Sequence, residues 1–551
     1  MATLDYKQPT LSARKPLDLH LQRFRHSSQP LYSDQLVCNV RNVNYANVAR
    51  MLHDHLGPRP DQEALVFEDR RYTFAELERC VDRTAHALSQ AGIRRGDRAA
   101  LLAGTSDHYV IAMFALAKLG AIAVPLNVRW AADEIAYALD DVTPALLLID
   151  AEHSELAGTG AARAAGAPAA LDLHAPPGRD SLAARAAAIT AAPLPYADVE
   201  LDDPHRILYT SGTTSRPKGA LHTHGCSAWN HRAMAADADL RPGDRLLVSY
   251  PMFHVSGLEA PGVFAALSAG VTCVLLDGGD AGTVLDVLER ERITLTVLLP
   301  PLYDEVLSAS PDRDLRALRW IITGAVTPAL MRRFTEMLPG KRLIEVFAMT
   351  EATGPLTLLD EAHMVEKAGR TGRAVRNVEL RIVDEQGQPV PAGTTGFVQA
   401  RGPKLSPGYW GTLEPVRPDP ARWFDTGDLG SLDSDGYLGY HGRAKEVIKS
   451  GGENVSMAEI ERVLGQHPGI QAACIVRITH PTWGEVPKAY VLLREGTQAD
   501  ADELEAWCRA SLAGFKVPRT WEFVDDLPFN HSGKVLRRVL QDHENTRTAP
   551  P

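Results

Sequence analysis

The sequence predicts an α/β protein, in which a large N-terminal domain of two doubly wound sheets and a small β subdomain precedes a small α+β C-terminal lid domain. Three observations support this fold class. The chain has 551 residues, more than one hydrophobic core usually organises, so at least two domains are expected. From about residue 62, short apolar runs alternate with helical patterns, which is typical of parallel sheets covered by helices. Past Arg443 the composition changes to that of a smaller unit.

The first half of the large domain is expected to begin with a well-marked helix. Thr73-Phe-Ala-Glu76 has the form of a capping box, and the apolar residues that follow it fall on one helical face. Those residues are Leu77, Val81, Ala85 and Leu88. Continuous apolar runs at 99–102, 121–124 and 145–149 predict strands that are buried on both faces. The segment from about 155 to 195 is rich in Ala, Gly and Pro, so we expect loosely packed helix and loop there.

The alternation resumes after residue 219 and predicts a second doubly wound half. Strands are expected at 271–276, 295–299 and 319–322, with a helix at Thr283–Arg292 between the first two. Thr327-Pro328 then begins another helix, because proline is favoured at the first helical position. Its core-facing residues would be Leu330, Phe334 and Leu338.

Two smaller units complete the predicted organisation. Between about 375 and 440, glycine, proline and β-forming residues predict a β subdomain with strands at 379–383 and 396–399. Beyond it, the C-terminal domain is expected to contain helices at 458–464 and 502–512 and strands at 472–478 and 488–493. The predicted regions are an N-terminal arm of unassigned role at 1–45, a large domain at 46–442 and a small mobile domain at 443–551.

Composition excludes several classes of function. A net charge of −11 argues against a general surface for nucleic acid or anionic membranes. The six cysteines are scattered, without the paired spacing of a zinc site or a disulfide framework. No apolar run has the length of a membrane span, and the N-terminus lacks a secretory hydrophobic region. A cytoplasmic enzyme is the simplest interpretation.

One loop carries the strongest chemical signal. Residues 209–219, Tyr-Thr-Ser-Gly-Thr-Thr-Ser-Arg-Pro-Lys-Gly, combine hydroxyl groups, two glycines and a lysine after a short apolar strand. The glycines permit backbone turns that aim N–H groups at an anion, and Lys218 adds positive charge. The order of residues differs from the common nucleotide-triphosphatase loop, in which a glycine stands directly before Lys-Ser/Thr. The loop therefore predicts a phosphate site, although Ser/Thr/Gly stretches are often only solvated turns.

This loop resembles the phosphate-binding motif of the adenylate-forming superfamily, which includes acyl-CoA synthetases, luciferases and the adenylation domains of peptide synthetases. Four further motifs of that family follow in the expected order. They are Phe347-Ala-Met-Thr-Glu351, Trp423-Phe-Asp-Thr-Gly-Asp428, Gly442-Arg-Ala-Lys-Glu-Val-Ile-Lys-Ser-Gly-Gly-Glu-Asn-Val455 and Pro528-Phe-Asn-His-Ser-Gly-Lys534. The resemblance covers the chain beyond about residue 45, and it implies a C-terminal domain that rotates during the reaction.

The chemistry of this family requires strong charge neutralisation. A carboxylate that attacks the α-phosphate of ATP brings two anions together before a mixed anhydride with AMP can form. The resemblance implies that Lys534 bridges the carboxylate and the α-phosphate, that Thr350 bonds the α-phosphate and that Glu351 is the Mg²⁺ ligand. It places these loop residues around the phosphates: Thr210, Ser211, Gly212, Thr213, Thr214 and Lys218. Without the resemblance, Lys534 would be read as an ordinary surface charge.

The same resemblance assigns residues to the nucleoside and to the hinge. Asp428 would accept both ribose hydroxyls, a role that suits a carboxylate with two acceptor oxygens, and Arg443 would lie in the same neighbourhood. Phe347 would belong to the nucleotide pocket, where Phe-Ala replaces the usual Tyr-Gly and alters the pocket's shape. Lys445 stands where the family has its hinge, so one backbone rotation would swing the small domain.

The thiol and acyl sites are implied less directly. Gly451 and Gly452 would allow close approach of the pantetheine arm of CoA. Trp483 and Phe515 match positions that contact CoA in the family, although each is equally compatible with a core aromatic. His254 would lie near the carboxylate or gate the thiol tunnel, or else be an ordinary packed histidine. The segments expected to line the acyl pocket are Trp229, Gly324-Ala325 and Thr353-Gly354.

The sequence thus predicts an AMP-forming acyl- or aryl-CoA ligase that uses ATP, Mg²⁺ and CoA. The carboxylic acid substrate would be aromatic, alicyclic or medium-chain, because the pocket segments contain no basic residue for a second carboxylate. An alternative is a stand-alone amide synthetase or carrier-protein ligase, which would pass the same acyl-AMP to an amine or a tethered thiol. A non-catalytic nucleotide-binding scaffold is a third hypothesis, and it would be expected to lack the charged groups that this chain retains.

Overall fold

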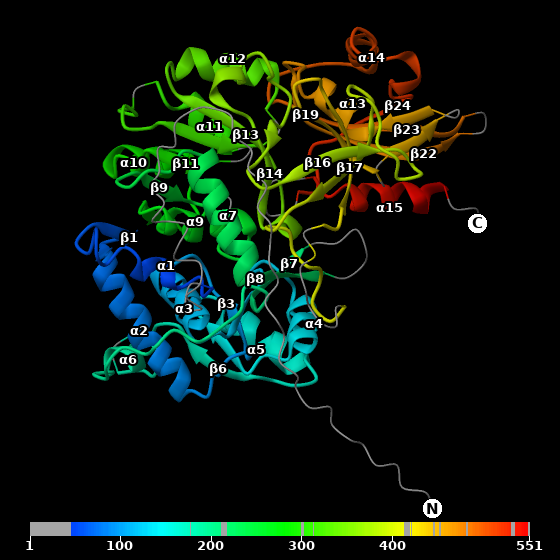
Figure 1. Ribbon diagram of the computed structural model, residues 1–551. Helices are drawn as coiled ribbons and strands as arrows, with labels where there is room; N and C mark the ends of the chain where they lie inside the picture. The colour runs from blue at the N-terminus through cyan, green and yellow to red at the C-terminus, as the bar shows by residue number, and fades with distance from the viewer. Residues whose placement is uncertain are drawn as a thin grey trace, which may run out of the picture. The chain divides into compact units, whose positions relative to one another are not determined.

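The computed structural model describes residues 46–551 apart from short gaps, and its helices and strands are labelled in Figure 1. The residues outside the description are 1–45, 177, 211–216, 260, 299–301, 312, 325, 413–418, 420, 445–446, 451–452, 481–482, 530–534 and 549–551, together with the side chains of 447, 449, 453 and 454. The predicted N-terminal arm at 1–45 therefore lies outside the described residues.

The first sheet of the large domain contains six strands within the described chain. In spatial order they are β6 (Ala169–Asp172), β5 (Leu146–Ile149), β3 (Arg98–Leu102), β4 (Ile122–Pro125), β7 (Pro204–Thr210) and β8 (Lys218–Thr223). Neighbouring strands are parallel except β7 and β8, which form an antiparallel hairpin. The strands predicted at 99–102, 121–124 and 145–149 are β3, β4 and β5, each within one residue of its expected bounds.

Helices surround this sheet and follow the capping chemistry in the sequence (Figure 1). They are α2 (Phe74–Gln90), α3 (Asp107–Lys118), α4 (Ala132–Val142), α5 (Ser154–Arg163) and α6 (Leu182–Ala187). The Thr73 hydroxyl accepts the Glu76 N–H at 3.2 Å, and the Glu76 carboxylate accepts the Thr73 N–H at 2.9 Å, so the predicted capping box is present. All four residues predicted on the inner face of α2 are fully buried.

The segment 155–195 is more ordered than predicted. It contains α5 and α6, and between them β6, which pairs in parallel with β5 and extends the sheet. β6 is a short edge strand in which Ala169 and Ala170 are exposed, so it lacks the continuous apolar run of a central strand. β6 is therefore a strand because it pairs with β5, and its own sequence pattern does not predict it.

The second sheet contains nine strands within the described chain. In spatial order they are β15 (Arg373–Ala374), β14 (Gly354–Leu358), β13 (Arg342–Met349), β12 (Trp320–Thr323), β11 (Leu295–Val297), β9 (Arg245–Val248), β10 (Thr272–Leu275), β1 (Glu63–Phe67) and β2 (Arg70–Thr73). The central strands are parallel, from β1 through β10, β9, β11 and β12 to β13. Because β1 comes from the start of the chain, the two halves of the large domain are interlocked rather than sequential.

The helices of this half are short or moderate in length. With the N-terminal α1 (Arg50–His53), they are α7 (His224–Asp237), α8 (Val255–Leu258), α9 (Val263–Ser268), α10 (Ala281–Arg290), α11 (Leu302–Ser308) and α12 (Pro328–Met337). The predicted start of α12 is confirmed, since the Thr327 hydroxyl accepts the Leu330 N–H at 3.1 Å and Pro328 is the first helical residue.

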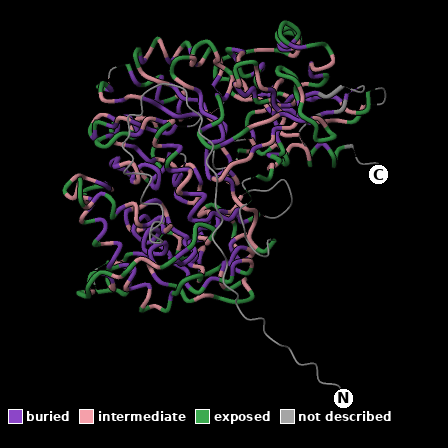
Figure 2. Tube along the Cα trace, in the orientation of Figure 1, coloured by how far each residue is buried: buried purple, intermediate pink, exposed green. Residues whose placement is uncertain are grey.

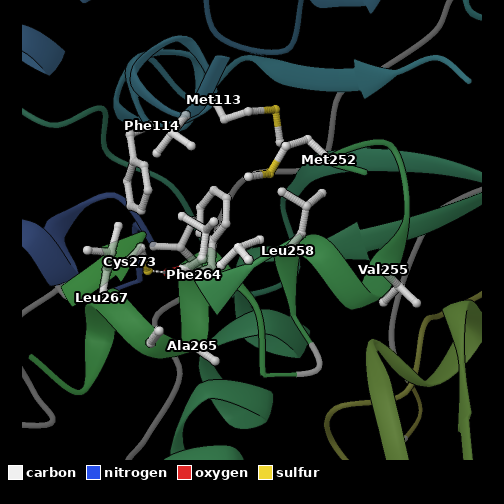
Figure 3. Packing of buried hydrophobic residues seen from close by; sticks show 14 of the residues in the cluster. Met113, Phe114, Met252, Val255, Leu258, Phe264, Ala265, Leu267 and Cys273 are labelled. Carbon is white, nitrogen blue, oxygen red and sulfur yellow. Dashed lines mark hydrogen bonds between the residues drawn. The ribbon is translucent and has the colours of Figure 1, made fainter. Parts of the chain in front are cut away.

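An apolar core joins the two halves. Phe114 of α3 stacks on Phe264 of α9, with ring centroids 4.4 Å apart and an interplanar angle of 15°, and Figure 3 shows the two rings side by side. Met113 and Met252 extend this contact toward α8. Buried chain accordingly runs through the strands and the inward helix faces of both halves (Figure 2). This core fixes α8 and α9 against the first half of the domain.

Two further sheets follow. The predicted β subdomain is an antiparallel sheet of β16 (Glu379–Val383), β17 (Gly396–Arg401), β18 (Phe424–Leu432) and β19 (Leu438–Arg443). The C-terminal sheet contains β20 (Val447–Ser450), β21 (Glu453–Ser456), β22 (Ile470–His480), β23 (Gly484–Leu493) and β24 (Thr520–Phe523), with α13 (Met457–Leu464), α14 (Ala501–Arg509) and α15 (Arg537–Thr548). Across the described residues, the helices are too short or too polar to span a bilayer.

Candidate active site

The predicted phosphate loop connects β7 to β8. Thr210 stands opposite Lys218 where the hairpin ends, and its hydroxyl donates to the Lys218 carbonyl oxygen at 3.4 Å. Tyr209 donates from its hydroxyl to Asp141 Oδ2 at 2.5 Å, which ties the hairpin to α4. The hairpin thus holds the two ends of the loop together. The other predicted loop residues, Ser211, Gly212, Thr213 and Thr214, lie outside the described residues.

A tyrosine joins the loop lysine to the predicted metal ligand. The hydroxyl of Tyr409 donates to Glu351 Oε1 at 2.7 Å, and Lys218 Nζ lies 5.4 Å from the centroid of the Tyr409 ring. Burial, together with the adjacent Glu351 carboxylate, raises the pKa of Tyr409, so its hydroxyl remains a proton donor at neutral pH. A cation, a phenol and a carboxylate therefore gather at the end of the hairpin.

Backbone pairing explains why Tyr409 lies there. The segment around it runs along β8: the Trp410 N–H donates to the Gly219 carbonyl at 2.8 Å, and the Leu221 N–H donates to the Gly408 carbonyl at 3.0 Å. Tyr409 itself is bridged to Ala220 in antiparallel register. A segment almost two hundred residues away in sequence is thereby held beside the phosphate hairpin.

Thr350 and Glu351 occupy a tight turn between β13 and β14. The turn is a single 3₁₀ segment, Thr350–Ala352, in which the Thr353 N–H donates to the Thr350 carbonyl at 3.0 Å. Thr353 has φ +53°, a left-handed conformation that is uncommon for a β-branched residue. The Glu351 carbonyl accepts the Ser406 N–H at 2.8 Å, so the turn is also attached to the segment that carries Tyr409.

A second cluster contains the predicted ribose ligand. Asp428 lies on β18 with 1% of its surface exposed, opposite Arg443 of β19, and Arg443 Nε is 3.1 Å from Asp428 Oδ1. The Tyr440 hydroxyl donates to the same oxygen at 3.4 Å. The Tyr440 ring also contacts Phe347, with centroids 5.7 Å apart. An acid, a guanidinium group and two aromatic rings are thus brought together from β13, β18 and β19.

Comparison with known proteins identifies this arrangement. Residues 52–410 match the family model of the AMP-binding enzymes, and residues 459–534 match that of the AMP-binding enzyme C-terminal domain. The chain belongs to the AMP-binding enzyme family. This family membership confirms the predicted resemblance to the adenylate-forming superfamily.

Individual relatives of this AMP-binding enzyme agree on the class of reaction. Feruloyl-CoA synthase from an Amycolatopsis species is 39% identical over 84% of this chain and 92% of its own length. Indoleacetate–CoA ligase from Aromatoleum aromaticum is 36% identical over 88% of this chain and 95% of its own length. The crystal structure of the anthranilate CoA ligase AuaEII, in complex with anthranoyl-AMP, has a TM-score of 0.84 at 27% identity and covers 92% of this chain and 99% of AuaEII. The predicted class, an AMP-forming acyl- or aryl-CoA ligase, is confirmed.

Several predicted site residues of the AMP-binding enzyme fall outside these two clusters. Lys534, Lys445, Gly451 and Gly452 lie outside the described residues, so their assignments stay predictions. The side chain of Trp483 is on the surface with 42% exposed, and the Arg519 guanidinium lies 5.4 Å from its ring centroid. Phe515, by contrast, packs partly buried against the C-terminal core.

His254 is held within its own turn. It caps the N-terminus of α8, where its Nδ1 accepts the Ser256 N–H at 3.1 Å, and its ring lies 5.2 Å from that of Tyr250. Burial lowers the pKa of His254 to about 4, so the ring is neutral at physiological pH and carries its proton on Nε2. The described contacts of His254 lie within residues 250–257, and its catalytic role stays a prediction.

The sequence analysis missed Tyr409, Tyr440 and a buried carboxylic acid, Glu345. Glu345 lies on β13, six residues before Glu351; its Oε1 accepts the Val326 N–H at 3.2 Å, and its Oε2 has no hydrogen-bond partner among the described residues. Burial raises the pKa of Glu345 to about 8. An acid inside the apolar run Leu343-Ile-Glu-Val-Phe347 was the available signal for Glu345, whereas the tyrosines gave none.

Replacing Glu345 with glutamine should stabilise the protein at alkaline pH. The folded state keeps this carboxyl protonated up to about pH 8, whereas the unfolded state releases the proton above about pH 4.5, so the free energy of unfolding falls as pH rises between these values. At pH 7 the raised pKa of Glu345 lowers the free energy of unfolding by on the order of 3 kcal/mol. In thermal melts, Glu345→Gln should raise the midpoint at pH 8 and leave it nearly unchanged at pH 5. An equal shift at both pH values would contradict the assigned pKa.

Proposed function

We propose that this AMP-binding enzyme uses ATP to convert an aromatic carboxylic acid into an acyl-AMP and then transfers the acyl group to CoA. The observation that carries the proposal is the convergence of Lys218, Tyr409 and Glu351 at the end of the phosphate hairpin. This arrangement supports the proposal, because a triphosphate would need a nearby ammonium group and a carboxylate able to hold a metal ion, and the two lie on either side of Tyr409. Because ATP and CoA are both metabolites of the cytoplasm, we also propose a cytoplasmic location.

The nucleoside would be held by the second cluster. Asp428 has the two acceptor oxygens needed for a ribose diol, and Arg443 supports its charge at 3.1 Å. Phe347 and Tyr440 offer neighbouring ring faces for a purine. The phosphate loop would surround the phosphates with hydroxyl and backbone N–H donors from Thr210, Ser211, Gly212, Thr213 and Thr214.

The residues around Glu351 fit a magnesium ion. Mg²⁺ is usually bound by one or two carboxylates together with substrate phosphates, and Glu351 supplies a carboxylate that Tyr409 orients through one of its oxygens. When bound, the ion would neutralise phosphate charge during the first half-reaction. Thr350, the neighbouring residue, would bond the α-phosphate.

The two half-reactions use different groups from the C-terminal domain. In the first, a substrate carboxylate oxygen attacks the α-phosphorus and pyrophosphate leaves, with Lys534 stabilising the developing charge. A rotation at Lys445 would then bring Gly451 and Gly452 to the site for the CoA thiol, which attacks the acyl carbonyl and expels AMP. The exposed ring of Trp483, with Arg519 beside it, suits a contact with CoA better than a core role.

The choice of substrate rests on the relatives. Ferulate, indoleacetate and anthranilate, the acids in the names of the three relatives above, each join an aromatic ring to one carboxyl group. We therefore favour an aromatic acid over the alicyclic and medium-chain acids, and CoA over an amine or a carrier protein as acceptor. His254 and Trp229 would lie near the acyl chain.

An exchange assay with a panel of acids tests this function. Radiolabelled pyrophosphate should be incorporated into ATP only when an acid is present, with cinnamic-, indole- or benzoic-type acids more effective than alicyclic or medium-chain ones. Adding CoA should then yield the thioester, whereas a panel of amines should yield no amide. Exchange with none of these acids would contradict the proposal, and amide formation would favour the alternative acceptor.

Lys534→Ala should abolish most of the first half-reaction. Loss of a group that stabilises transition-state charge typically costs about 10²- to 10³-fold in rate, and we expect that loss in pyrophosphate exchange. Thioester formation from supplied acyl-AMP should be much less affected. Lys516→Ala is the matched control, because Lys516 is a lysine of the same domain whose ammonium group pairs with Glu459 at 2.7 Å. Near-normal exchange in Lys534→Ala would refute the assignment.

Tyr409→Phe should weaken the response to magnesium. Removing the hydroxyl deletes its hydrogen bond to Glu351 Oε1, and loss of such an orienting contact typically costs about 10- to 100-fold in metal affinity. The Mg²⁺ concentration that gives half-maximal exchange should rise accordingly. Tyr440→Phe is the control, since Tyr440 contacts Asp428 and should alter the KM for ATP instead. An unchanged magnesium titration in Tyr409→Phe would contradict the arrangement.

A further inference from the structure

A fully buried histidine contacts the turn that carries Thr350 and Glu351. His222 lies on β8, four residues after Lys218, and its side chain has no exposed surface. Its Nε2 is 2.8 Å from the Thr350 carbonyl oxygen. On the other side of the ring, Nδ1 is 3.3 Å from Nη2 of Arg206, which belongs to the adjacent strand β7. The imidazole therefore connects the phosphate hairpin to the turn between β13 and β14.

The chemistry of its two partners determines the tautomer of His222. A carbonyl oxygen can only accept a hydrogen bond, and a guanidinium group can only donate. The Nε2 atom must then carry the proton, and Nδ1 must present its lone pair to Arg206. Burial and the positive charge of Arg206 lower the pKa of His222 to about 4, although the Glu259 carboxylate acts in the opposite direction. Lys404, which is also buried nearby, adds to the lowering.

Arg206 is itself immobilised by a buried acid. It pairs with Glu259 at the end of α8, and both side chains are fully buried. Glu259 also accepts hydrogen bonds from Ser227 Oγ at 3.0 Å and Asn230 Nδ2 at 3.0 Å, and it lies 2.9 Å from His231 Nε2. These three residues belong to α7. The donor that orients His222 is thus held by α7 and α8 together.

The turn that receives the His222 hydrogen bond needs external support. The Thr350 carbonyl already accepts the N–H of Thr353, whose left-handed backbone costs of order 1–3 kcal/mol and persists only where the surroundings enforce it. The second hydrogen bond to that carbonyl, from His222, fixes the direction of the first peptide group in the turn. The side chains of Thr350 and Glu351 project from the backbone that this contact holds.

We propose that His222 is a positioning residue: its neutral Nε2–H, oriented by Arg206, holds the Thr350 carbonyl and so aligns Thr350 and Glu351 for adenylate formation. This inference rests on the proposed function of Thr350 and Glu351. It assigns to the buried Arg206–Glu259 pair a part in the reaction, because that pair sets which nitrogen of His222 donates.

Three substitutions at one position separate this role from simple packing. Glutamine places an amide N–H where Nε2 lies, whereas asparagine reaches only as far as Nδ1 and leucine has no donor. His222→Gln should retain acid-dependent pyrophosphate exchange within a few-fold of the native protein. His222→Asn and His222→Leu should each lose about 10- to 100-fold in kcat/KM for MgATP, as is usual when a contact that orients a metal ligand is removed, with the KM for the acid little changed.

A second histidine provides the matched control. His224 is also fully buried, two residues further along, but its Nδ1 accepts the Val48 N–H at 3.2 Å instead of facing the turn. His224→Leu should lower the melting temperature as much as His222→Leu does, while leaving the exchange kinetics near those of the native protein. Equal kinetic losses in the two leucine variants would overturn the proposal, as would equal activity of His222→Gln and His222→Asn.

A measurement that is independent of activity separates failure of this inference from failure of the proposed function. Hydrogen–deuterium exchange of a peptide spanning 347–354 reports the N–H groups of this turn, including that of Thr353. We expect faster exchange in His222→Asn and His222→Leu and native exchange in His222→Gln. If all variants exchange alike, the inference is wrong even when the native protein is active. If the native protein activates no acid, the proposed function fails, and this peptide still decides the structural role.

Discussion

The buried ion pair between Arg206 and Glu259 is the constraint on which the site depends. Two charges without exposed surface are costly unless additional hydrogen bonds satisfy them, and removal of one partner leaves the other charge uncompensated. Ser227, Asn230 and His231 supply those bonds to Glu259. The charge of Arg206, together with the contact with His231, holds the pKa of Glu259 well below the usual range for a glutamate. The pair therefore permits one relative placement of β7, α7 and the end of α8.

Each of those elements carries or adjoins a residue that the sequence predicts for the site. β7 leads into the predicted phosphate loop, α7 carries Trp229, and His254 caps the N-terminus of α8. The stacked pair of Phe114 and Phe264 fixes α9 beside them, with the Arg206 guanidinium 5.0 Å from the Phe264 ring centroid. Apolar packing and a buried charge pair thus define the same geometry, which agrees with the view that polar groups in cores specify arrangement more than they add stability.

Much of the architecture follows from local sequence. The capping box at Thr73, the proline start of α12 and the apolar runs of β3, β4 and β5 predict their elements because each is decided by neighbours within a few residues. β6 escaped prediction because two of its four residues are exposed alanines and its definition comes from pairing with β5. The sequence analysis also did not predict that β1 belongs to the second sheet. Its partner, β10, lies about two hundred residues later in the chain, so local sequence carries no sign of the pairing.

Part of the candidate site also follows from local sequence. Lys218, Glu351, Asp428 and Arg443 were identified by motif, because each motif keeps a charged residue at a fixed place in a short segment.

The sequence by itself determined the family, the class of reaction and the charged groups, since these depend on residue type and order within single loops. Only the tertiary structure decided that Tyr409 bridges Lys218 and Glu351, that Tyr440 joins Phe347 to Asp428 and that His222 supports the Thr350 turn. Those contacts form between strands and loops remote in sequence, where hydrogen-bond direction and burial exist only after the sheets have assembled.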